Sequence, residues 1–247
     1  MYKRSHRQLR LSLRNILTAG WKCGLILTLS LSVLQTGCRD KTSSRDYDTG
    51  DEQSKEKFKR SVVPVADAEA AVIETENPAF GKIVIELYPN IAPKMVERFK
   101  QLIKEGFYNG TAFHRINAAV GLIQGGSPLS KDDNPDNDAA GDSTYPDLPA
   151  EFSDILYERG VVGAARNEEG APGATDAQLA NTANCQFYIT LKRQDAFDGR
   201  YTLFGRVIEG LSTADVISHA PVEAGTERPS SKIVIKSITL QPRSNFK

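Results

Sequence analysis

The residues best suited to chemistry lie between Phe113 and Gly126. Arg115 stands in a run of strand-forming residues, and Gln124 follows a short loop later, directly before two glycines. A guanidinium is always charged and presents several donors in a fixed geometry, so Arg115 could stabilise electron density that develops on a bound atom. No phosphate-binding loop, CxxC pair or nucleophile beside a base is found in the sequence. The sequence therefore favours chemistry by positioned hydrogen bonds over covalent catalysis.

Short strands and two helices are predicted around these residues. Apolar and polar residues alternate in 82–88, as in a half-buried strand. Further strand-like runs span 72–75, 111–116, 121–124, 161–165, 186–191, 203–208 and 232–240. Helical spacing predicts helices over 91–104 and about 212–219, the first with Pro93 in its first turn. This set of elements favours a closed antiparallel barrel, because closure leaves no exposed sheet edge.

Six blocks of sequence, spread over residues 68–243, follow one another in a characteristic order. They are Gly81–Pro89 with Ala92 and Pro93, Gly106–Arg115, Glu151–Asp154, Arg159–Arg166, Gln186–Thr190 and Phe197–Val207. In order and spacing these blocks resemble those of the cyclophilin-type peptidyl-prolyl cis/trans isomerases. The resemblance implies a mainly β fold: a closed eight-stranded antiparallel barrel capped by two α-helices, with a packed interior and the site on an outer face.

The resemblance also implies an activity, rotation about X–Pro bonds. Partial double-bond character gives this bond a barrier of about 18–20 kcal/mol, and uncatalysed turnover takes roughly 10–100 s. Catalysis requires that the twisted state, whose imide nitrogen carries a basic lone pair, is bound better than either planar isomer. Arg115 is the expected catalytic residue, and a rate gain of about 10⁴ needs only 5–6 kcal/mol. No cofactor is implied.

Eight further residues receive substrate-binding roles from the same resemblance. Those expected around the proline ring are Leu122, Tyr188, Phe197 and Tyr201, the last in place of a family histidine. Those expected to make polar or backbone contacts are Gln124, Ala165, Arg166 and Gln186, with Gln124 also holding the arginine. From the residues alone, the apolar members could equally be core side chains and Arg115 a surface ion pair; the six blocks favour a site.

Three departures from the family pattern fall at this site. One extra residue precedes Gln124, so the position of the family's pocket phenylalanine falls on Gly121 or Val120. Ala196 stands where animal cyclophilins carry tryptophan, and the connection over 167–184 is longer than is typical. These departures keep a second hypothesis open, a membrane-tethered module that binds proline-containing segments with little or no turnover.

The first 38 residues have a composition of their own. Six Lys or Arg and no acidic residue precede position 23, and residues 23–34 are mostly apolar. This run is too short to span a bilayer comfortably but suits the apolar region of an export signal. Its end at Gly37-Cys38 resembles a bacterial lipoprotein processing site, with Cys38 as the lipidated residue. Ordinary signal cleavage and an uncleaved anchor are the alternatives, and all three place the domain outside the cytoplasm.

The rest of the chain divides into three parts. Residues 39–67 are polar and charged, and such a segment cannot repay its ordering entropy, so we expect a disordered tether. The isomerase-like domain is expected over 68–243, with a short tail at 244–247. Lipidation would hold the domain at the periplasmic face of a bacterial membrane. Arg39, in place of a retention-type Asp, slightly favours the outer membrane.

The composition of the sequence argues against nucleic acid and metal ions as binding partners. The formal net charge is zero and no basic stripe stands out, so nucleic acid is not expected. The acidic residues of 132–138 do not fit an EF-hand loop, because Asn137 and Ser143 stand at its glycine and glutamate positions; no metal site is expected. Cys185, the only thiol of the predicted domain, is expected to be a buried small side chain. The expected partners are proline-containing proteins or peptides and a membrane, with a monomer as the default.

Overall fold

The computed structural model describes residues 58–247, apart from positions 169 and 171. The predicted export signal, Cys38 and most of the predicted tether lie outside the described residues. Within the described part, no helix combines the length and the apolar character needed to cross a bilayer.

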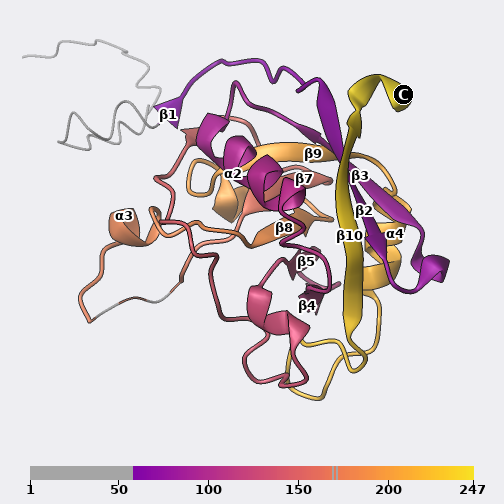
Figure 1. The fold of residues 1–247 in the computed structure, drawn as a ribbon. Coiled ribbons are helices and arrows are strands. Elements are labelled where there is room, and N and C mark those ends of the chain that lie inside the picture. The colour runs from indigo at the N-terminus through magenta and orange to yellow at the C-terminus, as the bar shows by residue number, and fades with distance from the viewer. Residues whose placement is uncertain (1–57, 169, 171) are drawn as a thin grey trace, which may run out of the picture. The chain divides into compact units, whose positions relative to one another are not determined.

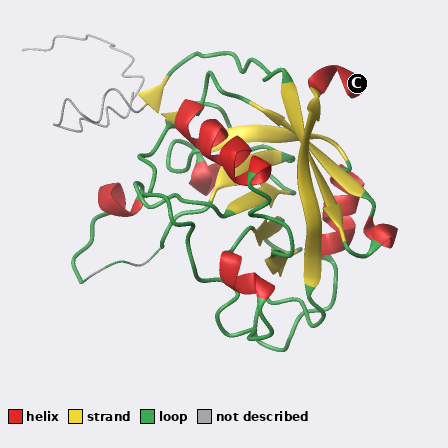
Figure 2. Cartoon of the chain, in the orientation of Figure 1, coloured by secondary structure: helices red, strands yellow, loops and turns green. Residues whose placement is uncertain are grey.

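Eight antiparallel strands close into a barrel (Figures 1 and 2). They are β2 (Glu69–Thr75), β3 (Lys82–Leu87), β4 (Ala112–Asn117), β5 (Leu122–Gly125), β7 (Val161–Ala164), β8 (Phe187–Thr190), β9 (Leu203–Glu209) and β10 (Ile233–Pro242). Their spatial order is β10-β2-β3-β9-β7-β8-β5-β4, and β4 returns to β10 by pairing Phe113 with Ile233. The predicted mainly β, closed eight-stranded barrel is confirmed.

The two predicted helices are α2 (Pro93–Lys104) and α4 (Leu211–Ser218), which lie on opposite sides of the strands in Figure 1. The backbone N–H groups of Lys94 and Met95, which have no partner inside α2, donate to the carboxylate of Glu151 at 3.1 and 3.0 Å. A third, short helix, α3 (Asp176–Leu179), was not predicted and lies in the long 167–184 connection. It begins with a capping box formed by Thr175 and Gln178.

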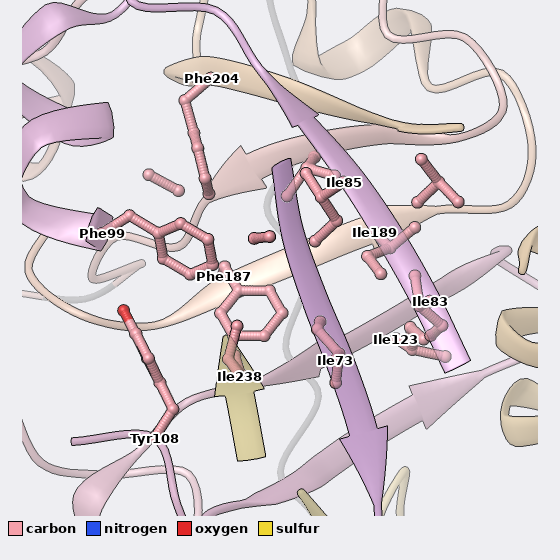
Figure 3. Close-up of a cluster of buried hydrophobic side chains, with 14 of the residues drawn as sticks. Ile73, Ile83, Ile85, Phe99, Tyr108, Ile123, Phe187, Ile189, Phe204 and Ile238 are labelled. Carbon is pink, nitrogen blue, oxygen red and sulfur yellow. The ribbon is translucent and has the colours of Figure 1, made fainter. Parts of the chain in front are cut away.

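The interior of the barrel is filled by aromatic and branched aliphatic side chains (Figure 3). Phe99 of α2 lies 5.5 Å from the Phe187 ring and 5.2 Å from the Phe204 ring, between centroids, so the helix is packed directly onto the strands. Cys185 is fully buried beside this core, as predicted. Burial raises the pKa of the Cys185 thiol to about 12, so the reactive thiolate is scarce at neutral pH.

The residues directly before the predicted domain make ordered contacts with it. Strand β1 (Phe58–Lys59) pairs in parallel with β6 (Phe152–Ser153). Asn90 then donates to the carbonyl of Val63 at 2.8 Å and accepts from the N–H of Val65 at 2.9 Å. Residues 58–67 therefore pack with the domain, although the sequence assigned them to the tether before the predicted start at 68. Composition missed this segment because backbone and amide hydrogen bonds, more than apolar burial, hold it.

The C-terminal end also belongs to the domain. Strand β10 extends to Pro242, and a 3₁₀ turn over Arg243–Asn245 follows. Phe246 is buried against Ala70 and Val84 on the outside of the barrel. The predicted tail over 244–247 is therefore packed as far as Phe246, because this one aromatic ring covers apolar strand residues that would otherwise face water.

An ion-pair cluster joins the start of the domain to α2 and gives it a pH-dependent contribution to stability. Lys100 Nζ lies 2.8 Å from Asp67 Oδ1 and 2.9 Å from Glu69 Oε2. Burial opposes ionisation of Asp67, but hydrogen bonds from Lys100 and the Glu69 N–H outweigh it and lower the pKa of Asp67 below its ordinary 3.8. A lowered carboxyl pKa stabilises the fold above the ordinary pKa, and this contribution is lost as the pH falls through the lowered value.

Asp67→Asn is therefore expected to destabilise the fold at pH values above the ordinary carboxyl pKa and to have no effect below the lowered one. We expect a loss of about 1 kcal/mol in the free energy of unfolding at pH 7. The difference from the wild type should disappear below the lowered pKa, where both proteins carry a neutral side chain. Urea titrations across this pH range measure it, with Asp133→Asn, at an exposed position, as control. An equal loss at every pH would contradict the assignment.

Candidate active site

Four neighbouring strands carry the predicted site in one row. Arg115 on β4 pairs with Gln124 on β5. Gln124 in turn pairs with Tyr188 on β8, and Tyr188 with Gly163 on β7. Residues directly opposite one another on adjacent strands point to the same face of a sheet. The alternate residues of these strands, among them Phe187 and Ile189, fill the core, so the row lies on the outer face of the barrel.

A chain of hydrogen bonds runs along the polar end of this row. Arg115 Nη1 donates to Gln124 Oε1 at 3.4 Å, and Gln124 Nε2 donates to Gln186 Oε1 at 3.1 Å. Gln186 Nε2 donates to the carbonyls of Ala139 and Gly141 at 3.1 and 3.2 Å. This series of hydrogen bonds ends on backbone carbonyls at Gln186, and at its other end the Arg115 side chain is 39% exposed. Its guanidinium is thus oriented yet open to solvent.

An aromatic cluster lies at the other end of the row. The Tyr188 ring centroid is 5.6 Å from that of Phe197 and 6.0 Å from that of Tyr201. Tyr188 and Leu122 are buried, at 3% and 5% exposure, whereas Phe197 and Tyr201 are partly exposed. The four residues predicted around the proline ring therefore lie together, two of them buried and two, which form the rim of the cluster, partly exposed. Sequence reasoning missed Tyr157, whose buried ring stacks on that of Tyr188.

The segment between Arg115 and Gln124 is one residue longer than in the family pattern, and the extra residue lies in the turn between β4 and β5. Leu122 pairs with Asn117, so residues 118–121 form the turn. Val120 is 45% exposed, and Gly121 has φ +81°, where a Cβ would meet Lys192 Cγ at 2.7 Å. Neither residue supplies the aromatic wall that the family pattern carries here, and the rim rests on Phe197 and Tyr201.

Ala165 and Arg166 lie where β7 ends. The N–H of Ala165 donates to the carbonyl of Gln186 at 3.0 Å, which continues the β7–β8 pairing past the strand. The Arg166 guanidinium lies over the Tyr201 ring at 4.6 Å from the centroid and donates to Asp176 Oδ1 at 2.8 Å. Its side chain is only 7% exposed. The structure thus uses the Arg166 side chain to fasten α3 to the rim of the cluster.

Two carboxylates face the Arg115 guanidinium. Glu168, from the long connection, has Oε1 3.9 Å from Nη1 and a side chain that is 70% exposed. Glu227 accepts hydrogen bonds from Arg115 Nε through one oxygen and from Asn117 Nδ2 through the other. Partial burial opposes ionisation of Glu227, but these two hydrogen bonds outweigh it and lower its pKa. Sequence reasoning missed Glu227, because it stands 112 positions from Arg115 and no motif surrounds it.

The acidic side chains of the 127–150 loop bond both within the loop and to residues outside it. Asp132 accepts from the N–H of Asn134 at 2.8 Å and from Asn137 Nδ2 at 3.1 Å, and Asp138 lies 3.9 Å from Lys232 Nζ. Among the residues that the structure describes, no three His, Cys, Asp or Glu side chains are grouped so that they could hold a metal ion.

Known proteins similar to this chain carry the name of one family. Residues 70–240 match the family model described as cyclophilin-type peptidyl-prolyl cis-trans isomerase. A protein of Brucella suis biovar 1, named a probable peptidyl-prolyl cis-trans isomerase, is 37% identical over 163 residues, which cover 64% of this chain and 78% of the relative. The peptidyl-prolyl cis-trans isomerase-like 3 of Gallus gallus is also 37% identical over 163 residues, covering 65% and 90%.

A solved structure gives the same result. The cyclophilin-type isomerase of Cryptosporidium parvum, crystallised in the presence of the dipeptide Ala-Pro, aligns with a TM-score of 0.58 and 26% identity. The alignment covers 70% of this chain and 98% of that one. The chain therefore belongs to the cyclophilin-type peptidyl-prolyl cis-trans isomerases, and the isomerase activity predicted from its sequence is the activity for which this family is named.

Proposed function

We propose that this isomerase accelerates X–Pro rotation by directing the Arg115 guanidinium at the imide nitrogen of a twisted substrate amide. The observation that supports this role is the row of Arg115, Gln124 and Tyr188 across β4, β5 and β8. The row sets a charged donor beside an aromatic surface. An X–Pro segment needs both, because its nitrogen requires a donor and its ring an apolar contact.

The twisted amide differs from both planar isomers at one atom that Arg115 can recognise. When the C–N bond twists, the imide nitrogen loses conjugation and its lone pair becomes a hydrogen-bond acceptor. A guanidinium donates to this lone pair in the twisted state alone, so the contact lowers the barrier without stabilising either planar isomer. Arg115 stays protonated throughout, because guanidinium groups keep their proton in proteins. The reaction then needs neither proton transfer nor a covalent intermediate.

The hydrogen bonds of Arg115 leave a donor for the substrate. Nε is taken by Glu227 and Nη1 by Gln124. Nη2 donates no hydrogen bond to any residue that the structure describes. With the side chain 39% exposed, this nitrogen is the one we assign to the substrate.

The aromatic cluster supplies the contact for the proline ring. Phe197 and Tyr201 are partly exposed and their ring centroids are 4.7 Å apart, above the buried Tyr188. Burial of a pyrrolidine ring against such surfaces is favourable by roughly 25 cal/mol per Å² of apolar area. Gln124 lies between Tyr188 and Arg115 and is bonded to Gln186, and we assign the substrate backbone to the amide of Gln124.

Exchange NMR on a proline-containing peptide tests the proposal with the full chain. We expect cis/trans exchange to become faster than the uncatalysed 10–100 s at catalytic protein concentration, together with weak, saturable binding. Tight binding without faster exchange would overturn the proposal and favour the proline-binding module. Shift perturbations confined to residues outside the row would also contradict it, because the peptide would then bind elsewhere.

We further propose that the isomerase acts outside the cytoplasm, held by a lipid on Cys38 at the periplasmic face of a bacterial membrane. Support comes from the order of features in the first 38 residues, in which six basic residues precede an apolar run and then Gly37-Cys38. In that setting, the clients would be exported proteins that fold at or near the membrane, with the outer membrane favoured by Arg39.

Replacing Cys38 with serine is expected to abolish fatty-acid labelling of the full chain in a bacterial host. The reason is chemical, because the thiol is the acceptor of the lipid. Cys185→Ser is the matched control, since that thiol is buried in the domain and its loss should leave labelling unchanged. If Cys38→Ser is labelled as strongly as the wild type, the lipoprotein proposal is wrong. If neither the wild type nor Cys38→Ser is labelled while both sediment with membranes, the uncleaved anchor is favoured.

A further inference from the structure

The segment between α4 and β10 is a closed turn held firmly against the site. Val222 pairs with Pro229, and Glu223 accepts from Arg228 Nε at 2.8 Å. The carbonyl of Glu227, two residues before Pro229, accepts from the N–H of Ile116 on β4 at 2.8 Å. The turn is therefore held at its base by the pairing and along its returning limb by a strand of the active-site row.

The carboxylate of Glu227 contacts two side chains of β4. One oxygen accepts from Arg115 Nε and the other from Asn117 Nδ2. Arg115 and Asn117 are two positions apart and so point to the same face of β4. Because Asn117 holds the second oxygen, the first cannot swing away from Arg115 without breaking a bond. The carboxylate thus acts as a fixed point for the Nε end of the guanidinium.

Two fixed points determine the direction of a planar group. Glu227 holds Nε and Gln124 holds Nη1, so the last torsions of the Arg115 side chain are restrained and the remaining nitrogen, Nη2, has a set direction. Glu168 is a poor candidate for the same task. Its single contact is 3.9 Å long and its side chain is 70% exposed, so a substrate can displace it.

The Arg115–Glu227 ion pair is expected to matter for the position of the guanidinium and to contribute little to the stability of the fold. The side chains of Arg115 and Glu227 are 39% and 36% exposed, and ion pairs this open to water contribute little to folding. A carboxylate beside a guanidinium also weakens its electrostatic field, which opposes catalysis. The pair can therefore favour turnover only if alignment of the donor outweighs that loss of field.

We propose that Glu227 is a positioning residue that aligns Arg115 for the twisted X–Pro amide, with Asn117 holding the carboxylate in place. This inference rests on the proposed role of Arg115 and assigns no contact between Glu227 and the substrate. It predicts that loss of Glu227 acts on kcat and leaves KM nearly unchanged, because the surfaces that bind both planar isomers remain.

Glu227→Gln in the full chain tests the proposal by exchange NMR. We expect kcat to fall about tenfold at unchanged KM, as misalignment of a catalytic donor does. The Nε–Hε resonance of Arg115 should shift and broaden, which loss of a merely structural contact elsewhere would not cause. Glu227→Asp keeps the charge but shortens the side chain by one methylene, so its kcat should lie between those of the wild type and Glu227→Gln. It also provides a second folded variant. Unchanged or faster turnover in both variants would overturn the proposal.

A matched control separates alignment from the integrity of the turn. Glu223→Gln removes a carboxylate from the same turn that bonds to Arg228 and does not contact Arg115. We expect its kcat to equal that of the wild type, and an equal fall in both Gln variants would overturn the assignment to Glu227. In an Arg115→Ala background, Glu227→Gln should cause no further loss. If Arg115→Ala itself keeps full activity, the proposed function fails; if it loses activity while Glu227→Gln does not, only this inference fails.

Discussion

Arg115→Ala is expected to lower kcat/KM for X–Pro rotation by about 10²–10³, the range seen when a single preorganised donor is removed from an active site. This loss corresponds to roughly 3–4 kcal/mol, at about 1.4 kcal/mol per decade, and is a large part of what an acceleration of 10⁴ requires. The remaining activity would come from the aromatic surface and the two glutamines, which are left in place. Exchange NMR or a protease-coupled assay measures the change.

The fold should tolerate this substitution. The Arg115 side chain is 39% exposed and its strand is held by backbone pairing to β5 and β10, so we expect the free energy of unfolding to change by about 1 kcal/mol or less. Arg159→Ala is a suitable control, because Arg159 forms a similar partly exposed ion pair with Asp215 that no predicted site residue joins. If the two variants isomerise equally well, Arg115 does not carry the chemistry.

Local pattern was sufficient to predict individual elements of the fold. Alternation in 82–88 and helical spacing after Pro93 correspond to β3 and α2, because each reports which side chains one element buries. The row itself follows from pairing: once 112–117, 122–125 and 187–190 are neighbouring strands, Arg115, Gln124 and Tyr188 meet by register. The resemblance supplied the number of strands in the barrel and the outer face as the place of the site, which periodicity alone could not.

What the sequence did not predict depends on contacts between distant segments. Glu227 reaches Arg115 across 112 positions, and β1 is formed by pairing with β6 about ninety residues away in the chain. Neither contact leaves a periodic signal, because a single carboxylate in a polar turn and a two-residue strand resemble any loop. Phe246 is similar, since one aromatic residue near the end of the chain does not reveal which strands it covers.

Gly163→Ala is expected to disturb stability and substrate binding together. A Cβ at position 163 would lie 2.4 Å from both Cζ and the hydroxyl oxygen of Tyr188, well inside van der Waals contact. The Tyr188 ring cannot simply turn away, because Tyr157 stacks on it and Phe197 packs edge-on at 5.6 Å. Overpacking of this kind costs about 1–3 kcal/mol, which lowers the melting temperature by about 2–4 °C for each kcal/mol in a domain of this size.

The expected effect of Gly163→Ala on substrate binding follows from the displacement of the Tyr188 ring. Because Phe197 and Tyr201 pack against Tyr188, any shift of its ring changes the surface assigned to the proline ring, and KM should rise more than kcat falls. A double-mutant cycle isolates the clash: Gly163→Ala should be nearly neutral for stability in a Tyr188→Leu background, where the atoms it meets are absent. A cost that stays the same in both backgrounds would contradict this account. It would show that the β7 backbone requires glycine at position 163 for a reason other than the contact with Tyr188.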